Sequence, residues 1–363
     1  MMAHQQISRG LARAGVLTSI ALALAGIFAC TGQPVTPAPA TMIASTDYPA
    51  AQAQTTVRSG VAGALGEAGQ QLAQSQGYFA QEGLTTEFVK VDPSAALTTL
   101  IAGQVDLSGF GLDPGLFNAI QRGVEFRIVA TQASSEPEAN GVFFVVRKDL
   151  VDSGRVRTNA DLKGLNIAIP GRGGSLEYVL ARAMEAGGLT LTDAELVVLN
   201  FPAMVSAVGS HAVDVALLPE PLATVAIQNG SAVKWKGLSD VVPGFQQTVV
   251  VFSAQFVAQR DLATRWTTAY LRGIRDYNDA FRKNLHRPET VQTLATAFAI
   301  KPTLFDGMGF MHINPDGKVN LASIHDLMRW YVQMGYLSEP VDLNRVVDPS
   351  FVEAAVAKLG AYQ

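Results

Sequence analysis

The sequence contains a single cysteine among its 363 residues, at position 30. Without a second thiol the chain cannot form an internal disulfide, so its core has to hold the fold together. Neither an HExxH motif nor a cysteine–histidine cluster is present, and the five histidines are scattered along the chain. The sequence therefore gives no motif for metal or thiol chemistry, and we expect no cofactor and no bound metal.

Clustered basic residues are also lacking. The chain has 27 Lys and Arg against 31 Asp and Glu, a formal net charge of −4. Binding to a polyanion requires basic side chains gathered in a patch or stripe, so we do not expect nucleic acid as a partner. The hydrophobic content of 48% is ordinary for a globular protein, and the length suffices for two compact lobes.

The N-terminal segment has the pattern of an export signal. Arg9 and Arg13 precede an uncharged stretch, residues 14–29 (AGVLTSIALALAGIFA), which is too short for a comfortable transmembrane helix. Cys30 follows directly and resembles the cysteine of a bacterial lipobox, although Phe28 departs from the small residue usual at its place. We expect a signal peptide at 1–29 and a lipid on Cys30; a plain signal peptide with an incidental cysteine is the alternative.

Residues 30–54 are rich in Pro, Thr, Ala and Gln and show no apolar periodicity, which is typical of a flexible tether. Removal of Arg9 and Arg13 with the signal changes the net charge from −4 to −4 − 2 = −6. We therefore expect an exported monomer, lipid-anchored on the outer face of the cell membrane.

An internal repeat indicates the architecture. From residue 55 onward, short apolar runs alternate with helical patterns, as in the βαβ units of parallel sheets. Residues 83–120 and 188–227 match each other, because each runs from Gly-Leu-Thr through a strand, a helix and a Val-Asp turn to an acid–Pro pair. Two copies of one pattern predict two similar lobes; chance similarity between Ala- and Val-rich units is the alternative.

Two apolar runs, residues 141–149 and 247–253, flank the second copy. We predict that both strands cross between the lobes and form a hinge. Lobe I is then residues 55–143 and 250–363, mostly helical after residue 254, and lobe II is residues 144–249. A ligand site is expected in the cleft, because binding sites favour domain interfaces and the C-terminal ends of parallel strands.

Four segments carry a resemblance to a known family: GYFAQEGL (77–84), AGQVDLSGFGLDP (102–114), DLKGLNIAIPGRGGSLEYVLARAMEAGGL (161–189) and AVDVALLPEPLATVA (212–226). Their order and spacing resemble the type II periplasmic substrate-binding proteins, in the branch that serves thiamine-precursor pyrimidines, alkanesulfonates, taurine and nitrate. The resemblance covers roughly residues 55–299. It implies an α/β Venus-flytrap fold with two parallel-rich sheets, a small-molecule solute, and delivery to an ABC permease that works with a separate ATPase.

Candidate ligand residues follow predicted strands at loops that face the cleft. The loop at 170–175 (PGRGGS) leaves backbone N–H groups at a helix start, where they favour a ligand oxygen; a tight βα turn is the alternative. Aromatic rings flanked by acids and an amide suit a planar heterocycle with N–H groups, although each ring alone can be a core residue. The predicted ligand-binding residues are Gly63, Phe110, Asp113, Ser135, Gly171, Arg172, Gly173, Gly174, Ser175, Tyr178, Phe201, Glu220, Phe245 and Gln247.

Arg172 is the main basic group near the predicted cleft, beside Asp113 and Glu220. We therefore expect a neutral aromatic solute such as riboflavin or a thiamine-precursor pyrimidine. An alkanesulfonate, taurine or nitrate is one alternative, and a membrane-tethered ligand sensor is another. We do not expect an enzyme: one relative of this type is a pyrimidine synthase that consumes its own histidine and needs a cysteine-rich iron motif, and this chain has one cysteine.

Overall fold

The computed structural model describes residues 54–137 and 139–363. The predicted signal peptide, Cys30 and nearly all of the predicted tether lie outside the described residues. Within the described part of the chain, no helix combines the length and the apolar character needed to cross a membrane.

The first sheet has five strands in the order β2-β1-β3-β10-β4. They are β1 (Thr55–Val61), β2 (Leu84–Lys90), β3 (Leu107–Gly111), β4 (Phe126–Ser134) and β10 (Gln246–Ser253). β1 pairs in parallel with β2 and β3, whereas β10 runs antiparallel to both β3 and β4. The sheet is thus parallel apart from one inserted strand that comes from far along the chain.

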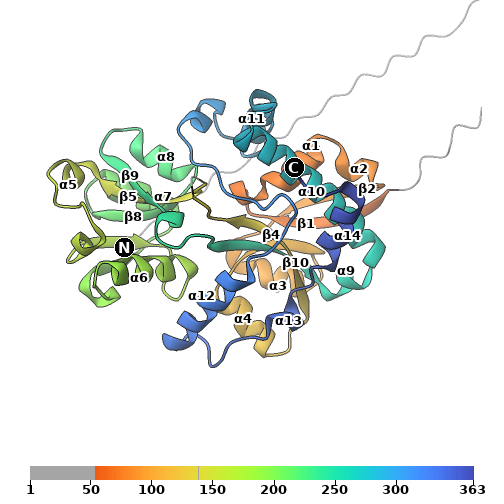
Figure 1. The fold of residues 1–363 in the computed structure, drawn as a ribbon, viewed down its shortest axis with the longest axis horizontal. Helices are drawn as coiled ribbons and strands as arrows, with labels where there is room; N and C mark the ends of the chain where they lie inside the picture. Colours follow the sequence, from red (N-terminus) through yellow and green to blue (C-terminus); the bar gives the residue numbers. More distant parts are fainter. Residues whose placement is uncertain (1–53, 138) are drawn as a thin grey trace, which may run out of the picture. The chain divides into compact units, whose positions relative to one another are not determined.

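The second sheet repeats this arrangement in the order β7-β6-β8-β5-β9. Its strands are β5 (Val142–Arg147), β6 (Asn166–Ile169), β7 (Glu195–Val198), β8 (Val215–Pro219) and β9 (Ala232–Gly237). β6 pairs in parallel with β7 and β8, and β5 is the antiparallel insert. In Figure 1, β1, β4 and β10 form one group of strands and β5, β8 and β9 another. The two similar sheets confirm the predicted two-lobed α/β fold.

The two predicted crossing runs form β5 and β10, and each of these strands lies within a single sheet. β5 pairs only within the second sheet and β10 only within the first. The chain crosses instead through residues 135–141, between β4 and β5, and residues 238–245, between β9 and β10. β5 has six residues and β10 has eight, which is the length of one buried strand, so neither strand is long enough to span both sheets. We therefore propose that the lobes meet at these two segments, with lobe I at 55–134 and 246–363 and lobe II at 142–237.

The crossing segments lie side by side at the first sheet. The Ser135 N–H donates to the Phe245 carbonyl oxygen at 2.9 Å, which continues the pairing of Ser134 with Gln246. The two segments therefore leave lobe I as a paired ribbon, which is the geometry expected of a hinge.

Helices cover both sheets. Lobe I contains α1 (Ala68–Ser75), α2 (Tyr78–Gln81), α3 (Ala96–Ile101), α4 (Pro114–Gln121), α9 (Ala254–Ala258), α10 (Arg260–Arg282), α11 (Arg287–Ala297), α12 (Leu321–Gln333), α13 (Leu343–Val346) and α14 (Ser350–Leu359). Lobe II contains α5 (Lys148–Asp152), α6 (Ser175–Ala186), α7 (Phe201–Gly209) and α8 (Leu222–Ile227). The predicted helical C-terminal part is confirmed, and it belongs to lobe I.

The core of lobe I is built on a close crossing of α1 and α10. The Trp266 ring stacks on Tyr270 with centroids 5.1 Å apart and on Phe79 at 5.8 Å. A Cβ placed at Gly273 would lie 2.0 Å from the carbonyl oxygen of Gly69, so the two helices touch at their backbones. This contact fixes the start of α1, which faces the cleft.

Helix α12 contacts both lobes. The Tyr331 hydroxyl donates to the Leu112 carbonyl oxygen of lobe I at 2.8 Å. On the lobe II side, the Tyr178 hydroxyl of α6 hydrogen-bonds to the Asp326 carboxylate, and the Tyr178 and Trp330 rings meet edge-on with centroids 5.6 Å apart. The helix therefore bridges the lobes beside the hinge.

Candidate functional site

A cavity of about 600 Å³ lies between the lobes. Its walls come from the C-terminal ends of β1 and β3 in lobe I, from those of β6 and β8 in lobe II, and from the loops that follow them. Seven of the predicted ligand residues line it: Phe110, Asp113, Gly171, Gly174, Ser175, Phe201 and Gln247. The volume lies in the range of small-molecule sites, and the position at strand ends is the one expected for an α/β protein.

The wall from lobe I carries two carboxylates. Asp113 caps α4 by accepting the Leu116 N–H at 3.0 Å, and its side chain is exposed to the cleft. Desolvation by the surrounding protein nevertheless raises the pKa of Asp113. This effect is larger than the opposite effect of the Leu116 and Gly115 N–H groups, which lower the pKa. Glu67 is buried, with 4% of its surface exposed, and burial raises its pKa as well.

The wall from lobe II includes the glycine loop 170–175, in which Gly171 faces open space. A Cβ added at Gly171 would meet no atom within 4 Å, so any larger side chain there projects into the cavity. Gly173 adopts a left-handed φ of 74°, which favours glycine, and its N–H donates to the Glu177 carboxylate at 2.5 Å. The loop therefore presents backbone and the Ser175 hydroxyl to a ligand.

Two buried polar atoms in the wall have no hydrogen-bond partner among the described residues. They are the Nε2 of Gln247, whose residue is 8% exposed, and the Oγ1 of Thr248. Both residues line the cavity. A buried polar group left unpaired costs about 1–3 kcal/mol, so the Gln247 amide and the Thr248 hydroxyl point to a polar group supplied from the cavity.

The side chains of three predicted ligand residues make other contacts within the protein instead. The Tyr178 ring packs on Phe245 with centroids 5.6 Å apart, and both side chains are almost completely buried. The Glu220 carboxylate binds the Lys234 ammonium and accepts the Gly309 and Thr224 N–H groups, each at 3.0 Å. None of the three lines the cavity, because each finds its partners on the C-terminal helices and loops or on its own lobe.

The other four predicted residues lie just behind the lining. Arg172 is about half exposed and pairs with Glu177 at 3.0 Å, and Gly173 binds the same carboxylate. Gly63, with a left-handed φ of 80°, sits between the lining residues 62 and 64. Ser135 lies in the crossing ribbon, where its hydroxyl donates to the Val242 carbonyl oxygen at 3.3 Å.

Sequence reasoning missed several lining residues, notably Glu67, Ser108, Thr248 and Met311. Ser108 and Thr248 are hydroxyl residues within the strands β3 and β10, and Met311 comes from a loop far along the chain. A signal for Glu67 existed: it follows β1 much as Glu177 follows β6, so extending the alignment of the two copies back to these strands would have placed it.

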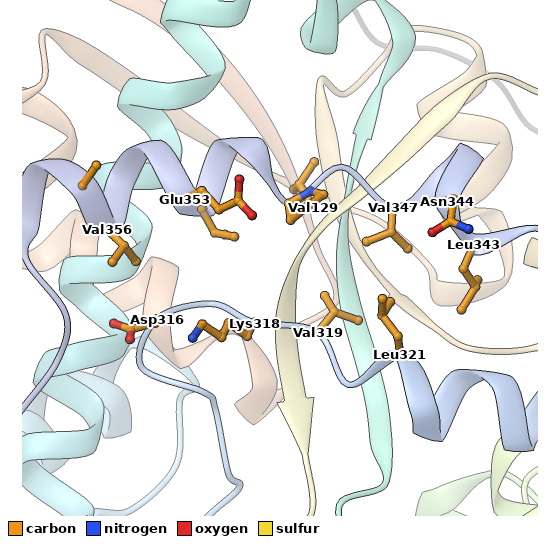
Figure 2. Close-up of a pocket in the computed structure, with 13 residues that line it drawn as sticks. Val129, Asp316, Lys318, Val319, Leu321, Leu343, Asn344, Val347, Glu353 and Val356 are labelled. Atoms are coloured by element: carbon orange, nitrogen blue, oxygen red, sulfur yellow. The ribbon is translucent and has the colours of Figure 1, made fainter.

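A second cavity of about 800 Å³ belongs to lobe I alone. Figure 2 shows its side chains: Val129 of β4, residues of the segment 316–321, and residues of α13 and α14. The walls are mostly apolar, with Asp316, Lys318 and Glu353 among them. Although it is larger, it holds none of the predicted ligand residues and touches a single lobe, so the interlobe cavity is the candidate site.

A family model described as NMT1/THI5 like matches residues 67–280. No curated protein sequence matches the chain significantly. Solved structures share the fold at low identity. The ligand-binding component of an ABC-type import system from Staphylococcus aureus has a TM-score of 0.68 and 15% identity, and the match covers 83% of this chain and 99% of that one.

The periplasmic aliphatic sulphonate-binding protein SsuA from Escherichia coli has a TM-score of 0.64 and 18% identity, covering 82% of this chain and 99% of its own. The desulfurization enzyme DSZB has a TM-score of 0.62 and 17% identity, and the match covers 84% of this chain and 100% of that one. The fold is thus shared by binding proteins and by an enzyme, and the function has to be argued from the site.

Proposed function

The chain belongs to the NMT1/THI5-like family, and we propose that it is the exported substrate-binding component of an ABC importer. The observation that carries the proposal is the cavity between the lobes, with the unpaired Gln247 amide in its wall. A solute that contacts both lobes stabilises their closed arrangement, and a permease with its ATPase then receives it. A lipid on Cys30 would hold the protein at the outer face of the membrane.

The lining supports a neutral or protonated aromatic heterocycle as the solute. The charged side chains among the described lining residues are two carboxylates, Glu67 and Asp113, and burial raises both pKa values. Phe110 and Phe201 supply aromatic faces, and the Gln247 amide supplies a donor and an acceptor. Riboflavin and a thiamine-precursor pyrimidine carry ring N–H or amino groups that such a lining can bind.

An alkanesulfonate, taurine or nitrate remains the second candidate. The shared fold with SsuA favours it, and the glycine loop offers backbone N–H groups for an anion. An anion would, however, lie in a cavity with two carboxylates and with Arg172 turned toward Glu177. We propose binding without turnover in either case; a ligand sensor would use the same site.

A titration of the purified protein with riboflavin, 4-aminopyrimidine, methanesulfonate and nitrate tests the proposal. We expect riboflavin to bind with a Kd of roughly 1 μM, about −8 kcal/mol, and to raise the Tm, and 4-aminopyrimidine is the probe for the pyrimidine alternative. Fluorescence quenching or calorimetry gives the affinity, and a thermal shift gives the stabilisation. Binding of methanesulfonate or nitrate with no response to either heterocycle would reject the heterocycle in favour of the anion.

A further inference from the structure

Each lobe has a buried glutamate just beyond the strand that precedes its copy of the repeat. Glu67 follows β1 at the start of α1, and Glu177 follows β6 in the first turn of α6. Their exposed fractions are 4% and 1%. β1 and β6 hold equivalent central places in the orders β2-β1-β3 and β7-β6-β8, so the two acids occupy equivalent positions in the fold.

Both carboxylates reach back to the loop that precedes their helix. Glu67 accepts the Ala62 N–H at 2.7 Å and the Gly63 N–H at 3.0 Å. Glu177 accepts the Gly173 N–H at 2.5 Å. Residues 62 and 64 in lobe I and residues 170, 171 and 174 in lobe II line the ligand cavity. The two acids therefore hold the two loops that form opposite walls of the candidate site.

The hydrogen bonds differ from ordinary helix capping. A capping side chain accepts N–H groups of the first helical turn, whereas these carboxylates accept N–H groups that come before the helix. Burying a carboxylate is costly unless donors surround it, and charge-assisted bonds to backbone N–H groups are shorter and stronger than neutral ones. A buried acid with backbone donors thus fixes a loop conformation that an apolar side chain would leave free.

The two acids differ in how their charge is balanced. Glu177 also pairs with Arg172 at 3.0 Å and accepts the Tyr336 hydroxyl at 3.0 Å, which ties the glycine loop to the segment after α12. Within the described part of the chain, Glu67 has backbone N–H partners and no ion pair. The loop of lobe II is therefore held from two sides, and that of lobe I by Glu67 alone.

We propose that Glu67 and Glu177 are a matched pair of positioning residues that hold the loops 62–64 and 170–174 in the conformation that receives the solute. This inference rests on the proposed function, because it assigns a role to one residue in the wall of the same cavity, Glu67, and to one behind it, Glu177. Each glutamate acts through its loop, so its loss weakens binding by releasing backbone groups that contact the solute.

The test uses Glu67→Gln and Glu177→Gln, which keep the side-chain size and turn an amide N–H₂ toward backbone donors. We expect riboflavin affinity to fall about tenfold or more in each variant, which is about 1.4 kcal/mol. Amide hydrogen exchange should quicken at Ala62 and Gly63 in the first variant and at Gly173 in the second, while the core strands stay protected. Tyr336→Phe removes one partner of Glu177 and should give a smaller effect of the same kind.

Asp161→Asn is the matched control. Asp161 accepts the Arg157 and Thr158 N–H groups at 3.0 and 2.7 Å in a loop that does not line the cavity. Its loss should quicken exchange at those amides and leave riboflavin affinity unchanged. Glutamine variants that bind riboflavin like the wild type, or that quicken exchange throughout the sheet, would overturn the positioning role.

The two proposals can fail separately. If the wild-type protein binds neither riboflavin nor 4-aminopyrimidine, the proposed solute class is wrong. The exchange rates at Ala62, Gly63 and Gly173 then decide the positioning role without any ligand: locally faster exchange in the glutamine variants supports it, and unchanged exchange rejects it.

Discussion

Gly171→Phe is expected to weaken riboflavin binding by at least about 100-fold, or about 2.7 kcal/mol, without unfolding the protein. Gly171 lines the cavity, and a Cβ at this position meets no atom within 4 Å. Its φ lies outside the left-handed region, so a larger side chain is not strained there. The phenylalanine ring therefore occupies the space that the solute requires, instead of displacing protein atoms.

A size series at the same position supplies the control. Gly171→Ala adds one methyl group to a cavity of about 600 Å³ and should bind riboflavin within a few-fold of the wild type. Both variants should unfold in urea within about 1 kcal/mol of the wild type, as expected for a substitution that faces open space. If Gly171→Phe retains wild-type affinity, the solute binds elsewhere.

Gly273→Ala is expected to destabilise the protein by about 3 kcal/mol or more, even though alanine is the better helix former. The added methyl carbon would lie 2.0 Å from the Gly69 carbonyl oxygen and 2.7 Å from the Ala73 nitrogen. Both are backbone atoms of α1, so no side chain can move aside and the helices have to separate. Because α1 begins directly after Glu67, the shift also disturbs the loop at 62–64.

Urea unfolding of Gly273→Ala beside Gly209→Ala checks this expectation. Gly209 is the last residue of α7, and a Cβ added there would lie 3.4 Å from its nearest neighbour, the Asn229 side chain. The Gly209→Ala substitution should leave the free energy of unfolding unchanged or raise it slightly, since alanine reduces the entropy of the unfolded chain. Equal stability of the two variants would mean that α1 and α10 are not packed backbone to backbone.

The sequence was sufficient to predict the repeat, because its signals are local. The Val-Asp pair of each copy has the same role in both lobes. Asp106 accepts the Arg58 N–H of β1 at 2.7 Å, and Asp214 accepts the Asn166 N–H of β6 at 2.9 Å. Each acid thus joins the strand that follows it, β3 or β8, to the neighbouring parallel strand, β1 or β6. The glycine loop and the strand-end residues Phe110 and Asp113 were found for the same reason, as they follow strands that the pattern makes visible.

Contacts over long sequence separations explain what the sequence did not reveal. The Tyr178 hydroxyl hydrogen-bonds to Asp326, which is 148 positions away, and Glu220 accepts the N–H of Gly309, which is 89 positions away. Both partners belong to the C-terminal part, which has no copy in the repeat. Glu67 was missed because its partners are backbone N–H groups, and its match to Glu177 becomes visible only when β1 and β6 are aligned.

Hydrogen exchange of the whole protein with and without saturating riboflavin tests the central claim most directly. A solute held between the lobes predicts slower exchange at the end of β3 and the residues after it (109–113) in lobe I, together with the loop 170–175 of lobe II. Protection confined to one of these loops, or found instead around the lobe I cavity at Val129 and Val352, would contradict it.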